Sequence, residues 1–178
     1  MTVKKYELTE ETKQHNGRTL RRIRALAAIA RFDVAAGDLG GWIEQESNLS
    51  HQGDAWVFGD AQVFGNAQVF GDAQVFGNAW VSGDARVFGD AQVSGDAWEQ
   101  SPLQIQGSRH FVTLCSLEQI AIGCHVHDFA YWKEHFKAIG RKERYSAEEV
   151  KEYRHHIGTC IAYAKSMKVR AESKVVSR

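Results

Sequence analysis

Residues 53–98 repeat a six-residue pattern, and this repeat limits the possible folds more than any other feature of the chain. The units read GDAWVF, GDAQVF, GNAQVF, GDAQVF, GNAWVS, GDARVF and GDAQVS, followed by a broken GDAW. A fixed short period predicts a stack of similar structural units. Ala and Val lie two positions apart, so they point to one side of a short strand. The variable residue and the Phe or Ser point to the other side.

The residues at the variable position decide which side is buried. They include Arg86 and four Gln, which are seldom buried without partners. The pattern therefore predicts Ala and Val inside and Phe outside. Gly followed by Asp or Asn supplies the bend between strands, because these residues tolerate unusual φ values. The expected dry core contains Ala61, Val63, Ala67, Val69, Ala73, Val75, Ala79 and Val81.

The narrow Ala and Val interior resembles that of the hexapeptide-repeat left-handed parallel β-helix, a triangular prism with about 18 residues per turn. In that family a bulky aliphatic residue stands four positions before a small residue, as Val57 precedes Ala61 here. The resemblance implies a mainly β fold built on a left-handed parallel β-helix over residues 41–99. Because terminal repeats are expected to be irregular, Gly41–Gln52 is predicted to form a degenerate first turn. In it, Ile43 and Leu49 take the Ala position.

The repeat is flanked by segments with other patterns. Residues 1–40 predict a β-hairpin cap, because the Asn-Gly pair after His15 fits a type I′ turn. The competing interpretation is an Ala-rich helix over Leu20–Ala30, and we favour the hairpin. Residues 100–178 predict strands followed by an α-helical hairpin. The expected strands are Leu103–Gln106, His110–Cys115 and Gln119–Ile122.

Two helices are predicted near the C-terminus. Phe129, Trp132, Phe136 and Ile139 share one helical face, and Gly140 is the expected end of that helix. Ser146-Ala147-Glu148-Glu149 reads as a capping box that opens the second helix. Its predicted apolar face consists of Val150, Tyr153, Ile157, Ile161 and Ala164.

A second resemblance spans most of the chain. The segment GDLGGWIEQESNLS, the G[DN]A repeats and the later YSAEEVKEYR resemble a group of phage and prophage proteins. The resemblance implies a viral context, and the cytoplasm of a host cell as the location. It supplies no catalytic residues to transfer.

The sequence favours a protein without enzyme activity. Known hexapeptide β-helices include acyltransferases and γ-type carbonic anhydrases, which use histidines on or beside the turns. Residues 53–98 contain no His, so we predict no catalytic residue and no cofactor. Cys124, His125 and His127 lack paired zinc-ligand spacing, so no metal site is predicted either. The alternative is a hexapeptide-repeat enzyme or a small-molecule or nucleotide-binding protein with a pocket between subunits. A pocket built from His110, Cys124, His125 and His127 would favour this alternative function.

Charge is unevenly distributed along the chain. Residues 41–98 carry one basic and eight acidic groups, whereas the whole chain is formally neutral. Three widely spaced Cys argue against a disulfide framework, and no apolar run suggests a signal peptide or membrane span. We therefore expect a cytoplasmic protein that does not contact membranes. At three units per turn the acidic side chains form a surface ladder of Asp54, Asp60, Asp72, Asp84, Asp90 and Asp96.

The acidic ladder has two interpretations. Its charge density approaches that of duplex DNA, which suggests a DNA mimic. Alternatively, Asp has only a structural role in the turns, because Asn replaces it freely along the repeat and both residues favour turns. Direct binding of nucleic acid is not expected.

Aromatic side chains on the outer faces predict a binding surface. If they are exposed, they form a patch at the upper limit for a soluble monomer. The expected interface residues are Trp56, Phe58, Phe64, Phe70, Phe76, Trp80 and Phe88. We therefore predict a phage-type binding protein that forms a homodimer or homotrimer. It is expected to bind and inhibit a host protein, as a counter-defence, anti-CRISPR-like inhibitor or DNA mimic does.

Overall fold

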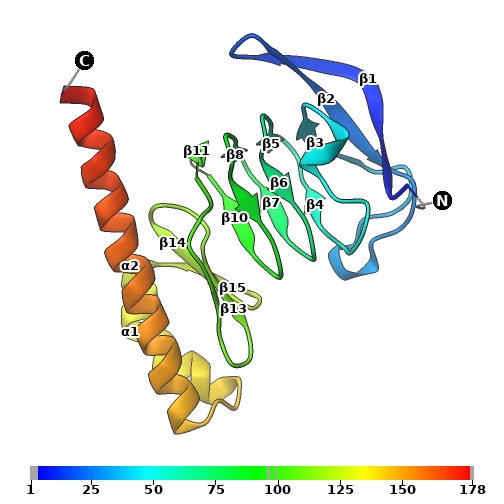
Figure 1. The fold of residues 1–178 in the computed structure, drawn as a ribbon. Coiled ribbons are helices and arrows are strands. Elements are labelled where there is room, and N and C mark those ends of the chain that lie inside the picture. The colour runs from blue at the N-terminus through cyan, green and yellow to red at the C-terminus, as the bar shows by residue number, and fades with distance from the viewer. Residues whose placement is uncertain (1–3, 96, 99, 177–178) are drawn as a thin grey trace. The chain divides into compact units, whose positions relative to one another are not determined.

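A computed structural model describes residues 4–95, 97–98 and 100–176 of the chain. It divides into two compact units, unit 1 (Met1–Pro102) and unit 2 (Leu103–Arg178). Figure 1 shows the hairpin and short strands of unit 1 and the strands and helices of unit 2. The two units are described separately below.

Unit 1 begins with an antiparallel hairpin. Strands β1 (Tyr6–His15) and β2 (Arg18–Ala25) pair through a turn in which Asn16 and Gly17 have φ values of 47° and 76°. These left-handed values suit an Asn-Gly pair. The competing helix over residues 20–30 does not form. The only helical segment nearby is the 3₁₀ turn η1 (Ala30–Phe32). Strand β2 also pairs antiparallel with β3 (Leu39–Ile43).

Each six-residue unit contributes one very short strand. Paired strands run parallel, and their partners lie 18 residues apart, as in the pairing of Trp56 with Gln74, except for β8 and β11, whose partners lie 17 apart. The hydrogen bonds run from the N–H groups of one repeat to the carbonyls 16 or 17 residues ahead. The strands are β4 (Trp56–Val57), β5 (Gln62–Val63), β6 (Gln68–Val69), β7 (Gln74–Phe76), β8 (Trp80–Val81), β9 (Arg86–Val87), β10 (Gln92–Ser94) and β11 (Ala97–Trp98).

The predicted fold class, a continuous left-handed parallel β-helix, is wrong for this chain. The strands form four separate small sheets, and none of them is closed or a solenoid. In strand order these sheets are β1-β2-β3-β5-β8-β11, β10-β7-β4, β6-β9 and β12-β13-β14-β15. The physical reason lies in the repeat itself, because a Gly with positive φ ends each strand after two or three residues. The antiparallel hairpin also joins the largest sheet, which is therefore mixed.

The predicted core of unit 1 is confirmed. All eight expected Ala and Val side chains have exposures of 1% or less. Ala55, Val57, Ala85 and Val87 extend the same row, also at 0%. The alternation of inward Ala and Val with outward side chains therefore holds along the repeat.

The first turn of the repeat differs in register from the prediction. Ile43 pairs with Val63, and Leu49 bridges to Val69, so both occupy the Val position and not the Ala position. These partners are 20 residues apart, whereas Val57 and Val75 are 18 apart. Two additional residues therefore lie between Leu49 and Val57. The 3₁₀ turn η2 (Glu46–Asn48), just before Leu49, also interrupts the repeat pattern.

Two buried side chains complete the first edge of the repeat. Within the repeat, carbonyls such as those of Gly71 and Ala73 accept N–H groups from the preceding units. The carbonyls at the first edge of the repeat have no preceding strand that could supply such N–H groups. Lys5 Nζ instead donates to the carbonyls of Gly53 and Ala55, at 3.0 and 2.7 Å. In the same way, Asn48 Nδ2 donates to the carbonyls of Gly65 (3.0 Å) and Ala67 (2.8 Å). These side chains protect an edge that would otherwise expose unpaired backbone groups.

Unit 2 consists of an antiparallel sheet and two helices. The strands are β12 (Gln104–Gln106), β13 (Phe111–Leu114), β14 (Gln119–Ile122) and β15 (His125–Asp128), and each pairs with the next. Three of them lie where the sequence predicted strands, whereas β15 was not predicted. Helices α1 (Phe129–Lys142) and α2 (Ala147–Val176) follow. None of the helices in the described ranges is both long and apolar enough to span a membrane.

The helix ends follow the predictions in part. The capping box is present, because the Ser146 N–H donates to Glu149 and the Glu149 N–H donates to Ser146 Oγ. Gly140, in contrast, does not end α1, which continues to Lys142. A Cβ at Gly140 would lie 3.0 Å from Val150 Cγ2, so this glycine instead allows the following helix to approach. Arg144, with φ 58°, makes the left-handed turn between the helices.

Candidate functional site

The predicted aromatic residues of unit 1 lie in three rows, which follow the paired strands: Trp56, Phe58 and Phe76 in the first, Phe64 and Trp80 in the second, and Phe70 and Phe88 in the third. The N-terminal segments partly cover the first two rows. Trp56 is only 1% exposed and contacts Tyr6 edge to face, with ring centroids 6.4 Å apart. The Phe58 ring lies 6.1 Å from that of Phe32.

His15, at the end of β1, covers the second row, 4.9 Å from the Phe64 ring and 4.5 Å from the Trp80 ring. Trp80 nevertheless remains 39% exposed. Phe76 is half-buried.

The third aromatic row combines a partly buried ring, Phe70, with an exposed one, Phe88. Phe70 and Phe88 follow the paired strands β6 and β9, and their rings stack with centroids 5.5 Å apart. Phe88 is 39% exposed. Arg86 lies over the Phe70 ring at 6.0 Å and donates to Gln68. We refer to Gln68, Phe70, Asp84, Arg86 and Phe88 as the Phe88 surface.

The acidic ladder is partly neutralised by the N-terminal segment. Arg31 forms ion pairs with Asp72 (2.7 Å) and Asp90 (2.5 Å). The Asp54 N–H donates to the Asp72 carboxylate at 3.1 Å, which is turn chemistry of the expected kind. The Asp54, Asp72 and Asp90 corner is therefore less negative than the sequence suggested.

Other parts of the ladder remain accessible. Asp60 and Asp84 are exposed, and Asp84 accepts a hydrogen bond from Asn66 at 3.0 Å. Asp96 lies outside the described residues. Of the described carboxylates, Asp60 and Asp84 are thus the ones most available to a partner.

An open polar groove of about 900 Å³ borders the Phe88 surface at Asp84. Glu44 lies in it and accepts from the Gly65 N–H at 2.7 Å and from Arg18 at 2.9 Å. The Gly65 N–H and the Arg18 guanidinium hold the pKa of Glu44 below its ordinary value, so this carboxylate stays charged at neutral pH. The groove also contains Asn66 and Asp84, which gives it an acidic character suited to basic side chains.

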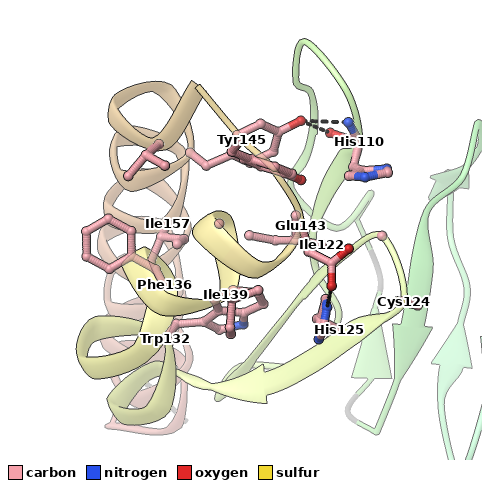
Figure 2. A pocket seen from close by; sticks show the side chains of 14 residues that line it. His110, Ile122, Cys124, His125, Trp132, Phe136, Ile139, Glu143, Tyr145 and Ile157 are labelled. Carbon is pink, nitrogen blue, oxygen red and sulfur yellow. Dashed lines mark hydrogen bonds and ion pairs between the residues drawn. The ribbon is translucent and has the colours of Figure 1, made fainter. Parts of the chain in front are cut away.

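Unit 2 gathers three of the four residues considered for an alternative pocket. His110, Cys124 and His125 line a partly open cavity of about 140 Å³, which Figure 2 shows from close by. His127 is not among its lining residues. Its ring instead stacks on Tyr131 at 4.0 Å, and burial lowers its pKa. No group of three His, Cys, Asp or Glu suited to a metal ion occurs within the described ranges.

Sequence reasoning missed two kinds of residue that shape these surfaces. Arg31, in an irregular segment, gave no sign that it would reach two Asp residues more than 40 positions away. Glu143 and Tyr145 line the cavity of unit 2 from the end of α1 and the turn that follows it. A capping box at Ser146 indicated a helix start beside them, but nothing in their spacing indicated a cavity.

Comparison with known proteins gives no family assignment, because the sequence matches neither a protein-family model nor a curated protein.

Proposed function

We propose that this chain is a non-enzymatic binding protein that recognises a partner protein through the Phe88 surface and the acidic groove beside it. The observation that carries the proposal is the 39% exposure of Phe88. N-terminal aromatic rings contact the other two rows, and this row keeps a large apolar side chain accessible. Exposed aromatic residues ringed by polar groups are typical of binding surfaces.

The chemistry of the surface specifies the kind of partner. Phe70 and Phe88 offer an apolar centre, and Asp84 offers negative charge at its edge, whereas the groove carboxylate Glu44 is paired with Arg18. A complementary partner presents an apolar side chain flanked by Lys or Arg. Such charge complementarity mainly increases the association rate and the selectivity.

The resemblance to phage and prophage proteins extends this proposal. On that basis the partner is a host protein in the bacterial cytoplasm, and binding inhibits it, as counter-defence proteins such as anti-CRISPR proteins do. DNA mimicry is one form of such inhibition. The pairing of Arg31 with Asp72 and Asp90 reduces the charge available for it, so mimicry would rest on Asp60 and Asp84.

The test is a pull-down from bacterial lysate with mass spectrometry, using wild type and Phe88→Ser. Serine occupies this position in two other repeats, at Ser82 and Ser94, so the substitution suits the fold. Partners specific to the Phe88 surface should be lost with Phe88→Ser and retained with the control Asn78→Asp, which alters an exposed turn residue elsewhere. Identical captured proteins for all three would contradict the proposal.

A second pair of substitutions tests the role of charge. Asp60→Asn and Asp84→Asn copy the Asn found in other repeats, so both should preserve the fold. If charge guides recognition, the double variant should bind the captured partner more slowly at low salt. The difference should shrink at physiological salt, where exposed charges are screened within about 8 Å. DNA mimicry would be excluded if the double variant kept the interaction and the binding did not depend on salt.

A further inference from the structure

The cavity of unit 2 has the size of a single aromatic ring. Its volume is about 140 Å³, and its apolar walls include Ile122, Trp132, Ile139 and Ile157. A dry apolar cavity of about 150 Å³ in another protein binds benzene. Figure 2 shows these apolar side chains, with Trp132, Ile139 and Ile157 from the two helices on one side and Ile122 from the sheet near Glu143.

Polar groups also line the cavity. His125 Nε2 lies 3.3 Å from Glu143 Oε1, and Figure 2 marks this pair. A carboxylate has two oxygens with several acceptor sites, so Glu143 keeps acceptor capacity beyond this contact. His110 also lines the cavity, stacked on Tyr145 with ring centroids 6.1 Å apart. An apolar pocket with a few convergent polar groups is the usual form of a small-ligand site.

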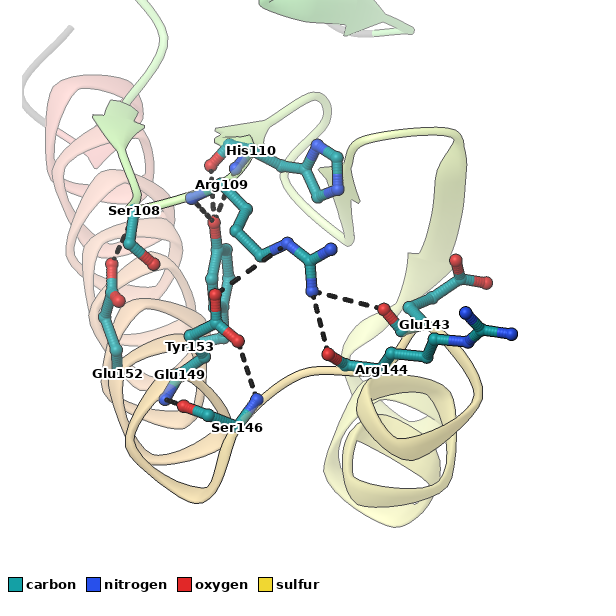
Figure 3. Close-up of polar contacts among 9 residues, drawn as sticks. All are labelled: Ser108, Arg109, His110, Glu143, Arg144, Ser146, Glu149, Glu152 and Tyr153. Atoms are coloured by element: carbon teal, nitrogen blue, oxygen red, sulfur yellow. Dashed lines mark hydrogen bonds and ion pairs between the residues drawn. The ribbon is translucent and has the colours of Figure 1, made fainter.

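The segment that carries His110 is fixed by a network of hydrogen bonds. The Tyr153 hydroxyl accepts from the N–H groups of Arg109 (3.0 Å) and His110 (2.6 Å) and donates to the His110 carbonyl (3.0 Å). A Cβ at Gly107 would lie 2.5 Å from that hydroxyl, so only glycine fits there. Figure 3 shows this arrangement, in which helix α2 determines the position of His110.

Arg109 links the segment that carries His110 to the end of α1. Its guanidinium donates to the carbonyls of Glu143 (3.2 Å) and Arg144 (3.1 Å) and lies 4.8 Å from the Tyr145 ring centroid. The segment bearing His110 is therefore tied to the end of α1 where Glu143 stands (Figure 3). Polar groups held in place before binding lose little entropy when a ligand arrives.

We propose that this cavity is a binding site for a small neutral aromatic molecule that carries one O–H or N–H donor, the class of phenol. The ring would fill the apolar side, and its donor would meet the Glu143 carboxylate or the His110 imidazole. The carboxylate disfavours an anionic ligand such as benzoate, because like charges repel at short distance. This site is separate from the Phe88 surface and does not depend on the function proposed for unit 1.

The test uses the full-length protein with ¹³C-labelled Ile methyl groups and the probes phenol, toluene and benzoate. Phenol should shift the methyl signals of Ile122, Ile139 and Ile157 with a dissociation constant of about 1 mM or lower. Ile23 and Ile43 in unit 1 serve as internal controls and should not move. Toluene should bind more weakly than phenol by about ten-fold, the usual effect of one hydrogen bond to a charged group, and benzoate more weakly still.

Variants distinguish filling of the cavity from recognition at its rim. Ile139→Phe should abolish binding of phenol and toluene alike, while Ala138→Phe adds the same ring at the neighbouring exposed position and should leave binding intact. Ile157→Phe is a second filling variant in case Ile139→Phe fails to fold. Glu143→Leu should weaken phenol binding by about five-fold or more while leaving toluene within about two-fold.

Two results would overturn the proposal. One is the absence of any methyl shift at Ile122, Ile139 and Ile157 with phenol at about ten times the expected dissociation constant. The other is equal binding of phenol and toluene that Glu143→Leu and His110→Phe both leave unchanged, because the polar rim would then have no part in recognition.

Discussion

Asn48→Asp tests the idea that a buried side chain replaces missing backbone donors at the first edge of the repeat. Asn48 is 0% exposed, and its Nδ2 donates to the carbonyls of Gly65 and Ala67. Its Oδ1 accepts from the Gln45 N–H at 2.9 Å. Aspartate has nearly the same shape and keeps this acceptor, but it turns an oxygen towards two carbonyls. The change therefore removes two hydrogen bonds without creating a cavity.

The magnitude follows from these contacts. Each lost hydrogen bond contributes about 1 kcal/mol, and a buried carbonyl left without its donor, as at Ala67, costs about 1–3 kcal/mol. The Gly65 carbonyl keeps a second donor, Gln45 Nε2, at 3.1 Å. The two effects overlap, and a buried carboxylate adds its own desolvation cost. We expect the free energy of unfolding of unit 1 to fall by about 3–5 kcal/mol at pH 7. Asn78→Asp makes the same chemical change at an exposed turn, where several repeats already have Asp. This variant should change the free energy of unfolding by less than about 0.5 kcal/mol.

Urea unfolding followed by tryptophan fluorescence measures the difference, because four of the five Trp residues lie in unit 1. The destabilisation of Asn48→Asp should also diminish in acid. Burial raises the pKa of a carboxyl above its unfolded value, and the protonated form donates to one carbonyl, so stability is higher below that value and is lost as pH rises. Equal unfolding free energies for Asn48→Asp and Asn78→Asp would refute the edge-capping role of Asn48.

Three further predictions concern the core, the first edge and assembly. Ala73→Leu should overpack the 0%-exposed core and lower the free energy of unfolding by about 1–3 kcal/mol in urea titrations, whereas unchanged stability would contradict the inward assignment. Burial lowers the pKa of Lys5 to about 8, so the unfolded state binds more protons above that pH. Stability should therefore rise from about pH 8 to about pH 10, and Lys5→Met should remove this rise. If the Phe88 surface also joins copies of the chain, light scattering should show an oligomer that Phe88→Ser reduces to a 20.0 kDa monomer, and a wild-type monomer would exclude self-association.

The sequence predicted the local features that depend on periodicity and turn chemistry. The six-residue period determined which Ala and Val are buried, and Asn16-Gly17 located the first turn. The arrangement of the strands into sheets did not follow from the six-residue period. A period describes the strands but not how far each sheet extends, and the Gly turns limit every strand to two or three residues. The register of Ile43 was also wrong, because two additional residues after Leu49 leave no trace in the period.

The candidate sites were less predictable than the fold. Outward Phe residues could be named, but their exposure depends on segments such as the one carrying Phe32, which covers Phe58 from 26 positions away. The cavity of unit 2 is built from loops, two strands and two helices, so no local pattern indicates it. His110 and His125 stood out only as residue types with versatile chemistry. Contacts between distant segments, which a single sequence does not reveal, decide both sites.

The N-terminal segment closes one edge of unit 1 and contacts two of its aromatic rows, which bears on the surface proposed for recognition. Lys5 and Asn48 satisfy the carbonyls that the first repeats would leave unpaired, and His15 packs on Phe64 and Trp80. These contacts stabilise the first edge of the repeat and cover part of its aromatic side chains. Phe88 lies on the remaining row, where Ser at the same position in other repeats shows that the fold does not need an aromatic ring. A large apolar side chain that is 39% exposed and replaceable by Ser within the same repeat agrees with the binding role proposed for the Phe88 surface.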